Sequence, residues 1–245
     1  MTSNGVLLEQ QAAALRAAGL HRLTISLDTL DRTRFRELTR NDALDRVIAG
    51  INTAAPLFPG LKLDTVVIRG VNDDELVALI EFARERGAEV RFIEYMDVGG
   101  ATHWSLDRVL SRAEMIRRLS EHYGPIEPVV EASSAPADRY RLPDGTVFGI
   151  ISSTTEPFCH SCDRSRLTAD GMWYTCLYAT RGVDLRRVLR SDATAEDLGR
   201  MIRQTWEVRT DRGAEDRLAS RDRGSLIPVD SLRRDPHLEM HTRGG

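Results

Sequence analysis

Residues 61–68 read LKLDTVVI and residues 90–96 read VRFIEYM. Both runs are short and rich in β-branched or aromatic residues, which predicts two buried strands. Between them, the tripeptide Asn72-Asp73-Asp74 offers N-cap side chains for a helix that we expect over residues 75–86. A strand, a helix and a second strand in this order predict a βαβ unit with parallel strands.

The same alternation continues toward the N-terminus. Residues 6–20 repeat apolar side chains at helical spacing and stop near Gly19, residues 23–27 predict a short strand, and residues 43–55 predict another helix. The fold class predicted for residues 1–100 is therefore α/β with a parallel sheet. Three strand-and-helix units are too few to close a barrel.

After residue 100 the pattern changes to shorter elements. Ser111 and Glu114 form a capping box at the start of a predicted helix. Short strands are predicted at residues 126–130 and 146–152, and a helix at residues 195–208. The residues beyond 210 show little periodicity and are expected to be irregular. Residues 101–245 are thus predicted to form a second domain of the α+β class.

The composition excludes several classes of protein. Hydrophobic residues make up 41% of the 245 residues and charged residues 29%, which is typical of a folded chain rather than a disordered one. No apolar run approaches the roughly 18 residues of a membrane-spanning helix, and the first residues do not form a secretory signal. A net charge of −3 argues against a protein that coats nucleic acid. We expect a cytoplasmic protein with no membrane or nucleic-acid partner.

All three cysteines, Cys159, Cys162 and Cys176, fall within one short segment. Disulfide frameworks instead spread an even number of cysteines along a short secreted chain. Two thiolates in a tight turn can hold one metal centre, and the third returns after a hairpin near Gly171. Thiolates are ligands for zinc or for iron–sulfur clusters. Structural zinc needs a fourth ligand, for which His160 is the nearest candidate, whereas a cluster can keep one iron open, and the spacing leaves both interpretations open.

Basic residues near the cysteines indicate anion binding. Arg164 and Arg166 follow Cys162, and in an extended segment alternate side chains point the same way, so both guanidinium groups could face the metal. Guanidinium groups suit phosphate. Lys62 is the only lysine among 34 basic residues and lies at the start of a predicted strand, where a lone lysine is also typical of an ordinary surface.

Several short motifs, in this order, resemble those of one family. They are TSNG at residues 2–5, SLD at 26–28, GVND at 70–73, RFIEYM at 91–96, the three-cysteine spacing with its two arginines, and the terminal Gly244-Gly245. Together they resemble the GTP 3′,8-cyclases, radical S-adenosylmethionine (SAM) lyases. The resemblance implies the conversion of GTP to 3′,8-cyclo-7,8-dihydro-GTP, the first step of molybdenum cofactor (molybdopterin) biosynthesis.

The resemblance also implies a fold and a set of ligands. The fold would be the later strands of an incomplete (β/α)6 radical-SAM barrel over residues 1–100, followed by an α+β domain with a [4Fe-4S] cluster. Cys159, Cys162 and Cys176 would hold that cluster, and its open iron would bind the purine of GTP. The other residues implied are Thr2, Lys62, Arg164, Ser165 and Arg166 for GTP, Ser26 and Met96 for SAM, and Arg164, Arg166, Gly244 and Gly245 for catalysis.

One motif of the family is absent. The Cys-x3-Cys-x2-Cys segment that holds the SAM-reducing [4Fe-4S] cluster has no counterpart, because no cysteine precedes Cys159. We therefore expect the chain alone to be unable to start radical chemistry. It would be a fragment, the partner of a separate N-terminal half, or a decayed copy that binds only a cluster and GTP, with a structural zinc domain as the remaining alternative. The edge of strand 23–27 is expected to be exposed, which favours a homodimer or aggregation.

Overall fold

The structure is a computed structural model that describes residues 1–98, 104–130, 134–220, 223–224, 226–235 and 238. It divides into two compact units. Unit 1 comprises Met1–Tyr95 and Asp107–Thr155, and unit 2 comprises Met96–Leu106 and Glu156–Gly245. No helix within the described residues is both long enough and apolar enough to span a bilayer.

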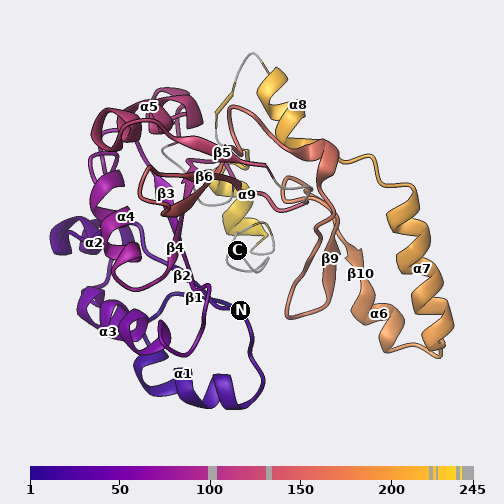
Figure 1. Cartoon of the computed structure of the whole chain (residues 1–245). Coiled ribbons are helices and arrows are strands. Elements are labelled where there is room, and N and C mark those ends of the chain that lie inside the picture. The colour runs from indigo at the N-terminus through magenta and orange to yellow at the C-terminus, as the bar shows by residue number, and fades with distance from the viewer. Residues whose placement is uncertain (99–103, 131–133, 221–222, 225, 236–237, 239–245) are drawn as a thin grey trace. The chain divides into compact units, whose positions relative to one another are not determined.

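Unit 1 is a seven-stranded sheet with helices on one face (Figure 1). The strand order is β1-β2-β3-β4-β7-β6-β5; the pairs from β1 through β4 to β7 are parallel, and β6 and β5 are antiparallel. The strands are β1 (Thr2–Ser3), β2 (Thr24–Ser26), β3 (Lys62–Val67), β4 (Glu89–Glu94), β5 (Glu127–Val129), β6 (Asp138–Arg141) and β7 (Val147–Ile151). The helices are α1 (Leu8–Ala17), α2 (Arg32–Thr39), α3 (Leu44–Ala54), α4 (Leu76–Arg84) and α5 (Arg112–Tyr123), with a short 3₁₀ turn η1 (Leu106–Arg108) at the unit boundary.

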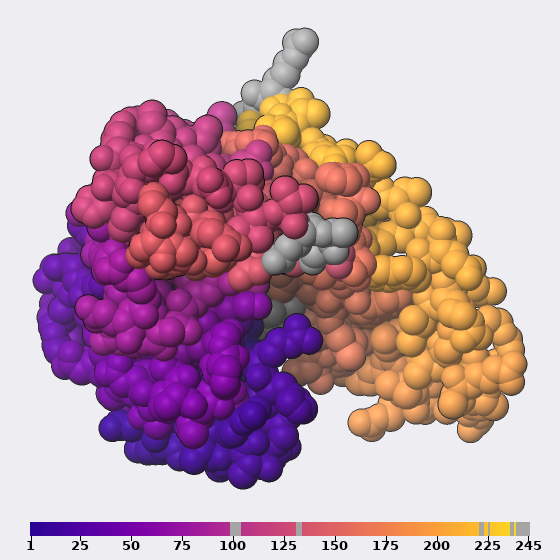
Figure 2. Space-filling view, viewed as in Figure 1, coloured from indigo at the N-terminus to yellow at the C-terminus, as the bar shows by residue number. Residues whose placement is uncertain are grey.

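The core of unit 1 follows from the alternation of side chains along its strands. Ile25, Leu63 and Phe92 are fully buried on the face that the helices cover. Their neighbours one residue along point to the opposite face because the strand period is two. In the space-filling view, residues 107–130 and 134–155 lie directly against the preceding part of the unit (Figure 2).

Unit 2 is built on a small antiparallel sheet of order β10-β9-β8. Trp173 of this sheet stacks on Trp206 of the longest helix, with ring centroids 6.4 Å apart. The elements are η2 (Cys159–Ser161), β8 (Arg166–Leu167), β9 (Met172–Tyr174), β10 (Val183–Asp184), α6 (Leu185–Leu189), α7 (Ala195–Glu207), α8 (Gly213–Ala219) and α9 (Val229–Arg234).

The coarse sequence predictions hold: this is an α/β protein with a sheet rich in parallel strands. The division expected at residue 100 differs from the two compact units, because β7 pairs with β4 and so brings residues 107–155 into unit 1. Helix α2 and strand β6 were not predicted. The residues beyond 210 were expected to be irregular, but α8 and α9 form there.

Two local expectations were wrong. Asn72 does not cap helix α4, which begins after Glu75 without a side-chain cap. The Asn72 amide instead donates to the backbone oxygens of Asp28 and Val66 and accepts from the N–H of Ile68, so it holds the end of β3 in place. The edge of β2 is also not exposed, because β1 pairs with it along Thr24 and Ile25.

Candidate functional site

The face of the unit 1 sheet opposite the helices is polar and carries most of the predicted ligand residues of that unit. Thr2 is in register with Thr24, and Thr24 with Lys62. Residues in register on neighbouring parallel strands point to the same side of the sheet, so the two predicted GTP residues, Thr2 and Lys62, lie in one row. The predicted SAM residue Ser26 lies in the next row, two residues further along β2.

The row that contains Ser26 also holds two charged residues. Ser26 is in register with Asp64, and Asp64 with Arg91. The buried Oδ1 of Asp64 has no hydrogen-bond partner among the described residues, and burial raises the pKa of this carboxyl. Burial, reinforced by the nearby Arg91, lowers the pKa of Lys62. The alternation of side chains along residues 61–68 predicts that Lys62 and Asp64 share one face of the sheet. That Arg91 lies beside them follows only from the pairing of β3 with β4 in the structure.

A second carboxyl, that of the half-buried Asp28, lies two residues beyond the end of β2. Burial raises the pKa of Asp28 to about 6, and the nearby Asp64 adds to the shift, whereas the N–H of Val66, which donates to Asp28 Oδ1 at 2.8 Å, opposes it. In the folded chain Asp28 therefore keeps its proton at pH values where the unfolded chain has lost it. The favourable contribution of this group to stability is complete below about pH 4 and is lost as the pH rises through 6.

We therefore predict that Asp28→Asn stabilises the chain at neutral pH. The amide oxygen can still accept from Val66, but the cost of ionising a buried carboxyl is removed. The free energy of unfolding of the variant, relative to the natural chain, should rise by about 1–3 kcal/mol between pH 4.5 and pH 7.5 in urea titrations. The exposed Asp192→Asn serves as the matched control, and an equal pH dependence in the Asp28 variant and the natural chain would contradict the prediction.

In unit 2 the three cysteines lie at the ends of short elements. Cys159 opens η2, Cys162 follows it, and Cys176 comes just after β9; all three are half-buried free thiols. The N–H of Cys162 donates to the backbone oxygen of Cys159 at 3.2 Å, which closes the turn between the first two thiols. The predicted hairpin is confirmed: β8 and β9 are antiparallel, and Gly171 between them has φ 91°.

Nitrogen donors surround two of these sulfur atoms. The Arg164 guanidinium donates to Cys162 Sγ at 3.3 Å, and the guanidinium of Arg209 lies 3.6 Å from the same sulfur. Burial opposes ionisation of the Cys162 thiol, but the donors at Arg164 and Arg209 outweigh it and lower the pKa. These donors stabilise the thiolate form of Cys162.

The third sulfur is held by backbone donors. The N–H of Tyr178 donates to Cys176 Sγ at 3.4 Å, and the N–H of Gly213 also donates to it, although burial still raises the pKa of this thiol. A Cβ at Gly213 would lie 2.4 Å from the Tyr178 Cβ and 3.2 Å from the sulfur, so only glycine permits this close approach. Within the described ranges, no three His, Cys, Asp or Glu side chains converge to hold a single metal ion, and His160 is exposed.

The other residues predicted for GTP, SAM and catalysis do not gather at one place in the described structure. Arg164 stacks on the Phe158 ring, with its guanidinium 4.5 Å from the ring centroid. Ser165 is exposed, and Arg166 is half-buried in β8 opposite Tyr174. Met96 is half-buried just beyond β4, at the start of unit 2. The predicted Gly244 and Gly245 lie outside the described residues.

The residue after Met96 forms a buried ionic centre that the sequence did not reveal. Asp97 is fully buried, and its carboxylate accepts from Arg217 Nε at 2.8 Å, Arg223 Nε at 3.2 Å and the Tyr178 hydroxyl at 3.2 Å. Its backbone oxygen accepts from the N–H of Leu226 at 2.8 Å. Tyr178 also donates its N–H to Cys176, so this centre links the segment that contains Met96 to the third cysteine.

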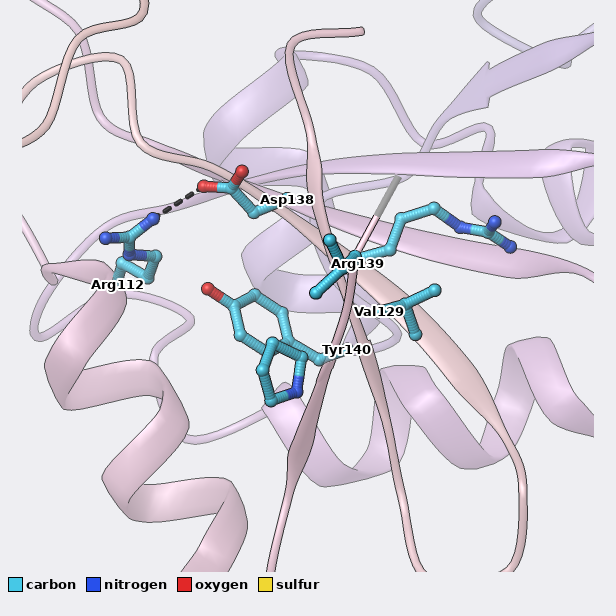
Figure 3. Close-up of a pocket in the computed structure, with 7 residues that line it drawn as sticks. Arg112, Val129, Asp138, Arg139 and Tyr140 are labelled. Atoms are coloured by element: carbon cyan, nitrogen blue, oxygen red, sulfur yellow. Dashed lines mark hydrogen bonds and ion pairs between the residues drawn. The ribbon is translucent and has the colours of Figure 1, made fainter. Parts of the chain in front are cut away.

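A pocket in unit 1 contains none of the predicted site residues. It lies beside β5, β6 and the start of α5, has a volume of about 340 Å³, and is open to solvent (Figure 3). An ion pair between Arg112 and Asp138, 2.5 Å apart, borders it. The lining residues are Arg112, Pro128, Val129, Val130, Asp138, Arg139 and Tyr140.

Comparison with known proteins gives matches along nearly the whole chain. Residues 1–83 match the family model described as Radical SAM superfamily, and residues 88–215 match Molybdenum Cofactor Synthesis C. The chain is similar to GTP 3′,8-cyclase 1 of Mycobacterium tuberculosis (strain ATCC 25618 / H37Rv), at 58% identity over 246 residues that cover all of this chain and 68% of that protein. It is also similar to GTP 3′,8-cyclase of Synechococcus sp. (strain WH7803), at 43% identity over all of this chain and 71% of that protein.

One solved structure also aligns with part of the chain. It is described as TYW1 with a lysine-pyruvate adduct bound, and it aligns at 20% identity and a TM-score of 0.38. The alignment covers 60% of this chain and 44% of that one, a likeness too weak to bear on the fold.

Proposed function

Since the chain belongs to the GTP 3′,8-cyclase family of radical SAM proteins, we propose that it supplies the GTP-binding part of that reaction. The family activity is the conversion of GTP to 3′,8-cyclo-7,8-dihydro-GTP, the first step of molybdenum cofactor biosynthesis. We propose further that β1 to β4 with their helices are the later strands of an incomplete (β/α)6 barrel. The parallel pairing of these four strands supports this proposal.

The donors around two of the three cysteines, Cys162 and Cys176, support this proposal most strongly. Cys159, Cys162 and Cys176 would hold a [4Fe-4S] cluster, for which thiolates are the usual ligands. The guanidinium groups beside Cys162 and the backbone N–H groups beside Cys176 fit such a group, because hydrogen bonds to sulfur stabilise its negative charge. With three thiolates from the chain, one iron keeps an open position, at which the purine of GTP would bind.

The chain's own residues would bind the rest of the nucleotide. Arg164, Ser165 and Arg166 follow the second cysteine, and guanidinium groups suit a triphosphate. On the polar face of the sheet, Thr2 and Lys62 would also contact GTP, and Lys62 has Arg91 as a cationic neighbour. Ser26 and Met96 would contact SAM. The proposed catalytic set is Arg164 and Arg166 with Gly244 and Gly245.

The chain supplies thiolates for one cluster only. Its 245 residues contain no cysteine besides the three in unit 2, so they offer no ligands for the cluster that reduces SAM. We therefore propose that these 245 residues by themselves bind GTP without cleaving SAM, and that radical initiation requires the Cys-x3-Cys-x2-Cys segment, which they do not contain. Association with a second copy of the chain is the other partner proposed.

The experiment uses the full chain reconstituted anaerobically with iron and sulfide. About four irons per chain would support the cluster, whereas about one zinc per purified chain would establish the structural zinc alternative. With SAM, GTP and a reductant, the chain alone should release no 5′-deoxyadenosine, and addition of an N-terminal half with the Cys-x3-Cys-x2-Cys motif should start its release. Failure of the complemented mixture, with both clusters intact, would contradict the proposed activity.

We predict that Lys62→Met weakens GTP binding about 10- to 100-fold in titration calorimetry. A hydrogen bond to a charged group contributes about 1.5–3 kcal/mol, and the variant removes the cation while it keeps a side chain of similar length. Arg36→Met, at an exposed position of α2, is the control and should bind GTP like the natural chain. Equal affinity of the Lys62 variant and the control would show that Lys62 does not contact the nucleotide.

A further inference from the structure

Arg209 and Asp211, just beyond the end of α7, contact two parts of the chain that carry the cysteines. These two cysteine arms are the turn with Cys159 and Cys162 and the segment with Thr175 and Cys176. Arg209 donates through Nη1 to the backbone oxygen of Cys162 at 2.9 Å, and its Nη2 lies 3.6 Å from Cys162 Sγ. The Arg209 side chain is only 10% exposed, and its guanidinium lies 4.7 Å from the centroid of the Trp206 ring. The direction of this guanidinium is therefore fixed by an aromatic face as well as by its hydrogen bonds.

The second arm is held by the carboxylate that neighbours Arg209. Asp211 Oδ2 lies 3.5 Å from Arg209 Nε and accepts from the Thr175 hydroxyl at 2.6 Å. Thr175 directly precedes Cys176. A series of contacts, Cys162–Arg209–Asp211–Thr175, thus connects the turn that carries two cysteines to the strand end that carries the third. Residues far apart in sequence join the two parts of the chain that carry the cysteines.

We propose that Arg209 and Asp211 form a clamp that fixes the two cysteine arms, and that Arg209 sets the reduction potential of the cluster they hold. This proposal rests on the proposed function, that is, on a [4Fe-4S] cluster at the three cysteines. Reduction adds one electron to the cluster and its thiolates. A guanidinium that donates to one of those sulfur atoms stabilises the added negative charge, so it raises the midpoint potential.

The geometry also explains why arginine is needed. One guanidinium contacts the Cys162 oxygen, the Cys162 sulfur and the Asp211 carboxylate through three different nitrogen atoms. A lysine ammonium carries the same charge at one nitrogen, without the planar fork. Lysine at position 209 would therefore keep part of the electrostatic effect and lose the connection between the arms.

The test is a redox titration, followed by electron paramagnetic resonance (EPR), of the anaerobically reconstituted full chain. In Arg209→Met the midpoint potential should become more negative by about 59 mV or more, which is a tenfold change in the ratio of reduced to oxidised cluster. Arg209→Lys should show a smaller shift in the same direction. Arg200→Met, on the exposed side of α7, is the matched control and should keep the natural midpoint.

A second measurement tests the clamp without changing any charge. Thr175→Val removes the hydroxyl that Asp211 holds and should speed the loss of iron to a chelator several-fold. Thr205→Val, whose hydroxyl donates to the Met201 backbone oxygen within α7, is its control. A purely structural role for Arg209 would change iron retention and leave the midpoint unaltered.

The outcomes separate the two proposals. Unchanged midpoints in Arg209→Met and Arg209→Lys would overturn the proposed effect of Arg209 on the reduction potential. Iron loss from Thr175→Val at the rate of the natural chain would overturn the clamp. If Arg209→Met holds no iron, its midpoint potential cannot be measured, and the midpoint potential of Arg209→Lys then tests the effect of Arg209. A natural chain that forms no [4Fe-4S] signal at all would instead overturn the proposed function.

Discussion

Cys162→Ala should lower the iron content of the reconstituted chain from about four atoms per chain to less than one. Cys162 is the thiol that receives the most cationic donors, from Arg164 and Arg209, so the structure favours its thiolate as a ligand. Two thiolates remain in the variant, and the chain contains no fourth cysteine that could replace the lost ligand. The cluster should therefore not form, and GTP binding through the open iron should be lost with it.

The control for this variant is Ser161→Ala, one residue away. Ser161 is exposed, and its hydroxyl makes only a long bond of 3.4 Å to the Phe158 backbone oxygen. Iron and sulfide analysis and the EPR spectrum should match those of the natural chain. Iron retained by Cys162→Ala at the level of this control would show that the sulfur atom is not a ligand.

Asp97→Ala is expected to destabilise unit 2 by about 3–5 kcal/mol, because it removes one partner of a buried ion pair. The Asp97 carboxylate is fully buried between Arg217 and Arg223, whose side chains are 20% and 6% exposed. Its loss removes the carboxylate with which both guanidinium groups pair and the acceptor of the Tyr178 hydroxyl. Asp97→Asn keeps the shape and should cost less than Asp97→Ala.

Unit 2 can be followed by its own spectroscopic signal. All three tryptophans, Trp104, Trp173 and Trp206, lie in this unit, so urea unfolding monitored by tryptophan fluorescence reports on it specifically. Asp230→Ala, at a side chain that is 84% exposed, is the control and should change the free energy of unfolding by no more than about 0.5 kcal/mol. An Asp97 variant as stable as this control would mean that the buried carboxylate is not needed for stability.

Local signals in the sequence predicted much of the fold. The apolar run at residues 61–68 forms β3, and Ser111 and Glu114 form the capping box at the start of α5, because both patterns act within a few residues. Strand β6 was missed because its polar residues, DRYR, carry no strand pattern and form a strand only by pairing with β7. The tripeptide at residues 72–74 was misread because Asn72 holds a loop rather than a helix start.

The candidate site was predictable only in part. Cys162 and Arg164 are two residues apart in the sequence, and in the structure the Arg164 guanidinium donates to the Cys162 sulfur. Asp97 and its partners Arg217 and Arg223 are more than a hundred residues apart, and Arg209 is 47 residues from Cys162. No periodicity or spacing encodes contacts over such separations, since they arise from tertiary packing. The roles assigned to Thr2, Ser26, Lys62, Met96 and the terminal glycines remain predictions.

Under the proposed function, three thiolates of unit 2 hold an iron–sulfur cluster whose open iron binds GTP. The most direct measurement is the EPR spectrum of the reduced, anaerobically reconstituted chain before and after GTP is added. We expect a [4Fe-4S] signal whose shape changes as GTP binds and does not change with ATP at the same concentration. A chain without iron, or a cluster signal that GTP leaves unaltered, would contradict the proposed function.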